Sequence, residues 1–369
     1  MTQNMDNKPA VKRESKNKIR VEFERTDLKE RLKTKYLSMY FLKRAVWYVF
    51  RLLMLIGIAF VVLQPFYTMI TRSIMAPQDF VDSTVVSVPK HLSMGIYKAI
   101  IEDLQYVKIF FATAGLSLAC ALLQTFSCCL IGYGLAKFKF RGNKIVFLAV
   151  ILTLAIPHGT LQAAMYRRFN NFDIFGIFKF LSGSAHTGIG WLDGILSKIH
   201  VLNMPNGLSM LETVMPLLLL SACGIAFKNG LYIFLLRQFF RGVPDELEES
   251  AYLDGATTFR TFWQVILPLS VPMMITVFLF AFCWQWTDDF YIPLFFPETQ
   301  PEYLMTYISR SLPLASLQTS FVQVTGSSAL YRKAMEYGCG LMACSPLVIL
   351  YLFCQRYLVQ GIERSGIVG

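Results

Sequence analysis

Five acidic side chains gather in one short segment of a chain that otherwise carries an excess of base, with a formal net charge of +11. The segment runs from Arg241 to Pro268, and its acids are Asp245, Glu246, Glu248, Glu249 and Asp254. A proline such as Pro244 suits the first turn of a helix, and acidic side chains stabilise the positive end of the helix dipole. The pattern predicts a short, rigid, acidic helix that can transmit force to a partner. An incidental amphipathic linker would leave the five acids unexplained.

The residues after this acidic helix predict a sharp turn and a second helix. Gly255 can adopt the left-handed conformation that ends a helix, and Thr257 or Thr258 can cap the next one. The second helix then leads through Pro268 into a long apolar stretch. The sequence therefore predicts a helix-turn-helix that continues directly into a membrane span.

Ionisable side chains inside apolar stretches are the next candidates, because they are costly in a bilayer and mark transport paths. Lys228 lies well inside such a stretch and is followed by Asn229 and a glycine, where the helix can break. Its side chain either faces a water-filled path or extends toward the headgroups near Arg237. His158 follows Pro157 and either lines a polar path or forms a hydrogen bond at a helix kink.

A further polar group stands at the outer end of an apolar stretch. Asp288 and Asp289 follow Trp284 and Trp286. Aromatic rings beside carboxylates suit either a sugar-contacting wall or an interfacial belt with solvated acids, and the belt is the simpler interpretation. Together with an amide between the two tryptophans, the candidate residues for a translocation path are Lys228, Asn229, His158, Gln285 and Asp288.

The sequence indicates neither a catalytic site nor a metal site. It contains no G-x-x-x-x-G-K-[ST] phosphate loop, no H-E-x-x-H metal motif and no G-x-S-x-G nucleophile motif, so any ATP must be bound by another chain. The eight cysteines lack C-x-x-C spacing and fall in apolar stretches. They are expected to be small buried side chains, with neither a disulfide framework nor a zinc site.

The elements that hold these residues are predicted membrane helices. Of the 369 residues, 54% are hydrophobic and 16% are charged, which excludes an ordinary soluble enzyme and a disordered chain. A bilayer core needs about 20 apolar residues of helix. Six stretches predict such spans, namely Leu52–Thr71, Ile109–Ala136, Ile145–Tyr166, Thr213–Leu236, Thr261–Thr287 and Tyr337–Gln355. The predicted fold is an all-α membrane protein with six transmembrane helices.

The distribution of Lys and Arg predicts the orientation of these spans. With the amino terminus inside, the inner segments hold 23 basic residues and the outer segments hold 11, so both termini are expected to be cytoplasmic. An inner-leaflet excess of base also explains the net charge better than nucleic-acid binding does.

This orientation divides the chain into four expected parts. Residues 1–45 form a cytoplasmic tail and the start of an interfacial helix over Tyr36–Phe50, and residues 46–108 form the first span and an outer loop. Residues 109–355 hold the remaining spans, and residues 356–369 form a second cytoplasmic tail. Residues 167–212 are expected to fold as an external cap.

The segment Glu249-Ser-Ala-x-x-Asp-Gly-Ala256, followed by Ile266-Leu-Pro268, resembles the EAA loop of binding-protein-dependent ABC importer permeases. A serine replaces one alanine of that motif, and the usual residue between the isoleucine and the Leu-Pro pair is missing. Segments 137–142 and 355–361 resemble parts of the MalG-like sugar permeases, and the resemblance covers about residues 46–369. It implies that the ATPase-coupling loop, between helices 4 and 5, contains Glu249, Ser250, Ala251, Asp254, Gly255 and Pro268.

The resemblance implies the second of two unlike permease subunits of a carbohydrate importer in a bacterial inner membrane. The expected partners are a second permease in a heterodimer, two copies of a cytoplasmic ABC ATPase, an extracytoplasmic solute-binding protein and the lipid bilayer. ATP and magnesium are expected on the ATPase, and no cofactor on this chain. Two alternatives remain. An ion-coupled secondary transporter could use Lys228 and Asp288, although coupled carboxylates at the bilayer midplane are missing. An intramembrane enzyme lacks paired catalytic groups.

Overall fold

The computed structural model of the chain describes residues 39–86, 88–173, 208–297 and 315–364. Within these ranges the regular elements are helices, joined by turns and two isolated β-bridges, which confirms the all-α prediction for the described residues. The chain divides into two units, residues 1–68 and 69–369. The amino-terminal tail before residue 39, residues 174–207 of the predicted external cap, and residues 365–369 lie outside the described ranges.

The described residues of the first unit all lie in helix α3 (Met39–Ser73). The last residues of this helix, 69–73, belong to the second unit. Its segment Lys43–Ser73 is long and apolar enough to cross a membrane, and its most apolar window is 0% buried within the chain. The predicted interfacial helix over residues 36–50 is not a separate element, because its described part runs without a break into the first span.

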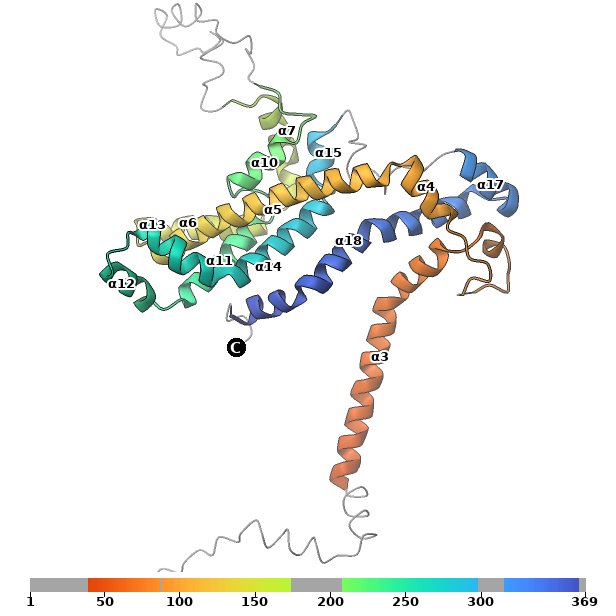
Figure 1. Cartoon of the computed structure of the whole chain (residues 1–369), viewed down its shortest axis with the longest axis horizontal. Coiled ribbons are helices and arrows are strands. Elements are labelled where there is room, and N and C mark those ends of the chain that lie inside the picture. Colours follow the sequence, from red (N-terminus) through yellow and green to blue (C-terminus); the bar gives the residue numbers. More distant parts are fainter. Residues whose placement is uncertain (1–38, 87, 174–207, 298–314, 365–369) are drawn as a thin grey trace, which may run out of the picture. The chain divides into compact units, whose positions relative to one another are not determined.

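The core of the second unit is built on helix α5 (Tyr106–Lys137), which packs against α11 (Asn229–Gly242) and α14 (Leu267–Trp286), while α18 (Ser328–Arg364) lies along α14 (Figure 1). Small side chains let membrane helices approach closely. A Cβ atom added at Gly132 of α5 would lie 3.0 Å from the Cβ atom of Leu236 on α11. The buried face of α5 repeats small residues every four positions, namely Ser117, Ala121, Thr125 and Cys129.

Short helices stand at the two ends of α5 (Figure 1). At one end are α12 (Glu246–Leu253) and α13 (Thr258–Thr261), and at the other are α4 (Gly95–Asp103) and α17 (Ala315–Thr325). Helix α13 continues through a π-helical turn, η3 (Phe262–Ile266), into α14. The resulting segment Thr258–Trp286 is a single candidate span, as the sequence predicts for the helix after the turn.

The third predicted span is bent rather than straight. Helix α6 (Asn143–Ala155) is followed by a 3-10 turn, η2 (His158–Leu161), and by α7 (Gln162–Asn170), and the two halves are inclined by 103°. A proline forces the preceding residue out of the helical region. Accordingly, Ile156 before Pro157 is extended, with φ −74° and ψ 121°. The stretch over 145–166 is therefore not one straight helix, and the bend falls at Pro157 and His158, where the sequence allows a helix kink.

The fourth predicted span, Thr213–Leu236, is also interrupted, and the break lies just before Asn229 and Gly230, where the sequence allows one. It consists of α10 (Met215–Ala222) and the start of α11, separated by residues 223–228. Gly224 has φ +71°, and a Cβ atom there would lie 2.6 Å from the Cδ1 atom of Ile131. A left-handed, tightly packed glycine therefore interrupts the helix before Lys228, which caps α11.

In the described residues, four helices are long and apolar enough to cross a membrane, or five if the bent pair forms one span. They are Lys43–Ser73, Tyr106–Lys137, Thr258–Trp286 and Ser328–Leu358, with Asn143–Ala155 and His158–Asn170 as the bent pair. A multi-pass membrane fold is thus supported. The predicted number of six and the cytoplasmic termini stay predictions.

Candidate functional site

The acidic helix α12 begins and ends where its residue types favour it. Asp245 is its N-cap residue, so Pro244 precedes the helix and the prediction that it lies in the first turn is wrong. Gly255 has φ +81°, and the amide of Ala256 donates to the carbonyl of Ala251 over 2.9 Å. This helix-ending arrangement requires a residue in the left-handed region, which glycine adopts without strain. The predicted helix end at Gly255 is confirmed.

The second helix of the element starts two residues later. Thr257 is extended, with φ −74° and ψ 160°, and its hydroxyl accepts a hydrogen bond from the amide of Arg260 at 3.4 Å. The π-helical turn η3 then leads to Pro268 in the first turn of α14. Proline has no amide hydrogen and so interrupts the hydrogen bonding of a helix, and the π-turn lies just before this interruption. Helix α12 is therefore connected to a membrane span through the continuous helical segment of α13, η3 and α14.

Lys137, the last residue of α5, holds the start of the acidic helix. Its ammonium group donates to the carbonyl of Val243 at 2.8 Å and to a carboxylate oxygen of Asp245 at 2.6 Å. A carboxylate oxygen of Glu248 lies 3.3 Å away, and the Lys137 side chain is only 8% exposed. The hydrogen bond from Lys137 lowers the pKa of the Asp245 carboxyl group. No sequence pattern pairs Lys137 with these partners, because they are more than 100 residues away.

Tyr133, one turn earlier on α5, completes this anchor. Its hydroxyl donates to the second carboxylate oxygen of Glu248 at 3.3 Å. Its ring centroid lies 4.9 Å from that of Phe262 in η3 and 5.6 Å from that of Phe240 in α11. The inner face of α12 is thus attached to α5 through Glu248, and Tyr133 of α5 packs in turn against aromatic rings of α11 and η3.

The outer face of the helix-turn-helix carries the predicted coupling residues. Glu249, Ser250, Asp254 and Gly255 are exposed, while Ala251 is half-buried. Two large apolar side chains of the same element are also exposed, Leu253 at 88% and Phe259 at 71%. An exposed surface that combines carboxylates with large apolar groups is typical of a protein interaction site. Pro268, the remaining predicted residue, is exposed in the first turn of α14 instead.

A cavity of about 220 Å³, lined by apolar and polar side chains, lies where α11 begins and α14 ends. Three of the predicted path residues line it, namely Lys228, Gln285 and Asp288. Gln124 of α5 also lines it, and its side-chain amide donates to the hydroxyl of Ser221 at 3.1 Å. Gln124 is not among the residues predicted from the sequence, although an amide inside a long apolar stretch is itself a signal of a polar path.

Two aromatic rings hold the Lys228 side chain in this cavity. Its ammonium nitrogen lies 4.3 Å from the ring centroid of Trp284 and 4.4 Å from that of Phe227. Both distances are within the range of attractive cation–π contacts. Lys228 is therefore directed into the cavity lining.

Asp288, in the same cavity, accepts hydrogen bonds that hold the neighbouring backbone. One of its carboxylate oxygens accepts hydrogen bonds from the amides of Phe290 and Tyr291 at 3.0 and 2.9 Å, and the other accepts one from Gln285 at 3.2 Å. These bonds fix the start of the short helix α15 (Tyr291–Phe295). Asp289, in contrast, is exposed at the cavity.

The two other predicted path residues do not line this cavity. His158 lines a neighbouring cavity of about 320 Å³ and packs against the rings of Phe227 and Phe290. Asn229 is fully buried, and its side-chain amide has no hydrogen-bond partner among the described residues. A transport role for any of the five residues stays a prediction.

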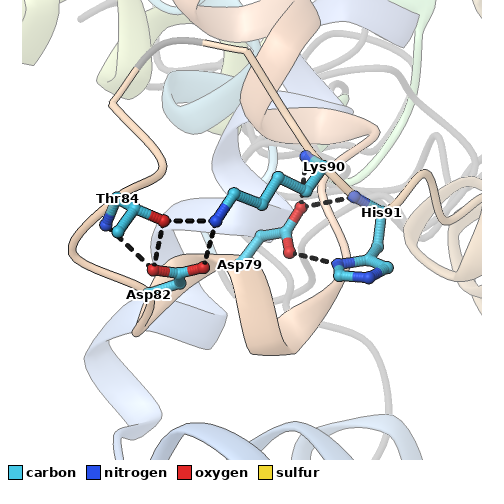
Figure 2. Close-up of polar contacts among 5 residues, drawn as sticks. All are labelled: Asp79, Asp82, Thr84, Lys90 and His91. Carbon is cyan, nitrogen blue, oxygen red and sulfur yellow. Dashed lines mark hydrogen bonds and ion pairs between the residues drawn. The ribbon is translucent and has the colours of Figure 1, made fainter.

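A further polar cluster, which the sequence analysis missed, ties together the loop between α3 and α4 (Figure 2). The buried Asp79, in the 3-10 turn η1 (Pro77–Phe80), accepts hydrogen bonds from the amides of Lys90 and His91 at 2.8 and 2.7 Å. Its other oxygen lies 2.7 Å from the His91 ring nitrogen Nδ1. Lys90 also bonds Asp82 at 2.8 Å and contacts Thr84.

This cluster depresses the pKa of both carboxyl groups. Burial by itself raises the pKa of Asp79, but the hydrogen bonds from His91 and Lys90 outweigh it and hold the pKa below its ordinary value. The bond from the Lys90 side chain lowers the pKa of Asp82. Because Asp79 is separated from its partners by more than ten residues of irregular chain, no sequence pattern marks the cluster.

The described residues offer no metal site, since no three His, Cys, Asp or Glu side chains among them lie close enough together to share an ion. The eight cysteines are free thiols, of which Cys120, Cys128, Cys129 and Cys339 are buried and Cys223 and Cys344 are exposed. The prediction that the cysteines are buried side chains is thus confirmed for only part of them.

The class of this protein follows from its match to a known family. The model of the family described as binding-protein-dependent transport system inner membrane component matches residues 129–363, which include α11, the acidic helix-turn-helix and α14. The chain belongs to this family. It is therefore a multi-pass membrane component of a transport system, and the resemblance found in the sequence is confirmed.

Similar proteins have names from carbohydrate transport. The chain is 25% identical over 308 residues to the probable starch degradation products permease AmyC of Thermoanaerobacterium thermosulfurigenes, covering 83% of this chain and 91% of that protein. It is 24% identical over 264 residues to the arabinooligosaccharides permease AraQ of Bacillus subtilis strain 168, covering 72% and 74%. A bacterial ABC transporter that imports the acidic polysaccharide alginate shares the fold, with a TM-score of 0.58 and 18% identity over 85% of this chain and 97% of that one.

Proposed function

We propose that this chain is a permease subunit of an ATP-driven ABC importer for carbohydrate. The observation that carries the proposal is the helix-turn-helix of residues 244–268, which is anchored on α5 by Lys137 and presents Glu249 outward. Family membership supports the importer assignment. The names of AmyC and AraQ support carbohydrate as the cargo. The chain itself performs no covalent chemistry.

The proposed assembly contains this chain, a second permease, two copies of a cytoplasmic ABC ATPase and an extracytoplasmic solute-binding protein. The family description, which names a binding protein, supports the last of these. The unburied apolar surface of α3 suits lipid or contact with the second permease. Six spans with cytoplasmic termini, in a bacterial inner membrane, are part of the proposal, and the bias of 23 inner against 11 outer basic residues supports them. ATP and magnesium belong to the ATPase.

Coupling in this proposal is mechanical. Closure of the ATPase dimer displaces α12, whose exposed Glu249 and Leu253 dock on the ATPase surface. The displacement reaches the membrane by two routes. One is the helical continuity of α13, η3 and α14, and the other is the contact of Lys137 and Tyr133 of α5 with Glu248. The spans tilt, and the path between the two permeases changes from inward-facing to outward-facing.

An ion-coupled secondary transporter is not favoured. Family membership argues against it, and Asp288, which would serve as its carboxylate, uses both oxygens to accept hydrogen bonds within the chain.

The proposal is tested by purification and reconstitution. A tagged chain expressed with its neighbouring transport genes is expected to co-purify with an ABC ATPase and a second permease. Proteoliposomes of this complex, with the solute-binding protein outside, should take up a labelled oligosaccharide only when ATP is present on the ATPase side. Uptake that follows an imposed proton or sodium gradient and ignores ATP would overturn the proposal.

A further inference from the structure

The cavity at the start of α11 has the size and lining of a site for one sugar unit. Its volume of about 220 Å³ is below the range of roughly 300–1,000 Å³ found for pockets that enclose drug-sized ligands. It therefore suits a single ring of an oligosaccharide rather than the whole molecule. Aromatic side chains stand beside buried amides in its lining, as in sites that orient polar ligands. The buried amides are Gln124 and Gln285, and the aromatic groups include Trp284 and Tyr291.

Lys228 gives this lining a positive charge without a counter-ion. The ion pairs among the described residues do not include Lys228, so no carboxylate there lies within 4.0 Å of its ammonium group. The rings of Phe227 and Trp284 hold the ammonium group by cation–π contacts. A partly buried charge that lacks a partner of opposite sign is unfavourable, so an anion arriving in the cavity would meet an unsatisfied cation.

The two carboxylates of the lining do not act as the counter-ion of Lys228. Asp288 already accepts three hydrogen bonds from Gln285 and from the amides of Phe290 and Tyr291, which directs its oxygens toward the chain. Asp289 is exposed to solvent. An anionic group adds Coulomb attraction to the hydrogen bond from the ammonium group, which a neutral hydroxyl does not, so Lys228 favours an anionic group over a hydroxyl.

We propose that this cavity is a saccharide subsite in which Lys228 binds an anionic group of one sugar unit, such as the carboxylate of a uronic acid or a phosphate. This assignment rests on the proposed function, because it makes the cavity part of the sugar path. It adds that this subunit contacts its cargo directly and selects charged saccharides at that point.

Equilibrium binding tests the proposal on the purified permease complex without ATP and without solute-binding protein. The probes are digalacturonate, galactose 6-phosphate and the neutral disaccharide galactobiose, titrated by calorimetry. At least one anionic probe is expected to bind more tightly than galactobiose. Lys228→Met should weaken that binding roughly tenfold or more, and Lys228→Arg should retain most of it. The control Lys144→Met removes an exposed cation from the first turn of α6 and should change nothing.

A second variant keeps the test decisive if Lys228→Met fails to assemble. Asp289→Asn removes the exposed negative charge beside the cavity and should strengthen binding of the anionic probe a few-fold, because repulsion is relieved. Equal or absent binding of all three probes would overturn the assignment, as would a Lys228→Met complex that binds digalacturonate and galactose 6-phosphate like the wild type.

Failure of the subsite and failure of the importer are distinguishable. If ATP drives oligosaccharide uptake but Lys228 variants bind every probe normally, the importer stands and the subsite is wrong. If the complex binds the anionic probe through Lys228 but shows no ATP-driven uptake, the subsite stands and the importer is wrong.

Discussion

The ammonium nitrogen of Lys137 lies 2.6 Å from a carboxylate oxygen of Asp245. This contact joins the last residue of a membrane helix to the N-cap residue of the acidic helix α12. Asp245 is 81% exposed, so the pair alone stabilises little, but the same ammonium group reaches Val243 and the largely buried Glu248. Lys137 therefore holds the start of α12 against the end of α5.

Lys137→Met should uncouple ATP hydrolysis from uptake. The change leaves Glu248 without its cation and the Val243 carbonyl without its donor, at a cost of about 1–3 kcal/mol to the docking of α12. The ATPase should remain bound, because the outer face of α12 is unchanged. The measurement is the ratio of sugar uptake to ATP hydrolysis in proteoliposomes. Lys139→Met changes an exposed lysine in the loop just after α5; it is the control and should keep the wild-type ratio. A wild-type ratio in Lys137→Met would remove Lys137 from the coupling route.

Gly255→Val should abolish ATP-driven uptake while membrane insertion survives. Gly255 has φ +81°, where a Cβ atom costs about 1–2 kcal/mol and a β-branched side chain costs more. Nothing within the chain lies within 4 Å of a Cβ atom placed there, so the effect comes from the backbone and from the docked ATPase. Gly255→Asn is the matched control, because asparagine tolerates the left-handed region, and it should retain part of the uptake. Normal uptake by Gly255→Val would show that the turn is not used for coupling.

Glu249→Lys should release the ATPase from the membrane. Glu249 is exposed, so its carboxylate can pair with a basic group on the ATPase. Removing one member of a partly buried charge pair costs on the order of 3–5 kcal/mol. Glu249→Gln, which keeps the shape and loses the charge, should have a smaller effect. Co-purification of the ATPase with each variant measures both. Full retention of the ATPase by Glu249→Lys would contradict a contact at this residue.

The sequence predicted the helix-turn-helix well because its signals are local. Gly255 and Thr257 act on their own backbone and on residues within five positions, so residue type decides the geometry. The spans around α5 and α14 were also predictable, because each is one uninterrupted apolar stretch.

The remaining features depend on contacts that a linear pattern does not contain. Hydropathy sums over a window and does not register the backbone conformation, so it predicts neither the size of the bend at Pro157 nor the position of the interruption at Gly224. The anchor between Lys137 and Asp245 joins positions 108 residues apart. The cavity likewise brings Gln124, Lys228 and Gln285 together from three helical segments.

Cysteine labelling should place the acidic element in the cytoplasm. In a background in which all eight native cysteines are replaced, Ser250→Cys is expected to resist a membrane-impermeant maleimide added to intact cells and to react after permeabilisation. Ser83→Cys, exposed in the loop after α3, is the matched control and should react from outside. Labelling of position 250 in intact cells would invert the topology and remove the contact with a cytoplasmic ATPase.

Asp79→Asn should loosen the loop between α3 and α4, and acid should do the same to the wild type. The folded-state pKa of Asp79 lies below its ordinary value of 3.8, so its ionised form stabilises the loop above that pH, and the stabilisation is lost as pH falls through the lowered folded-state pKa. Hydrogen exchange of residues 77–92, corrected for the intrinsic pH dependence, should show protection at pH 7 and 5 that declines toward pH 3, and low protection in Asp79→Asn at each pH. Asp82→Asn is the matched control, because its ion pair with Lys90 is largely exposed and should contribute little. If Asp79→Asn keeps wild-type protection at pH 7, the hydrogen bonds to Lys90 and His91 do not hold the loop, and its order comes from the apolar contact of Phe80 with Phe321.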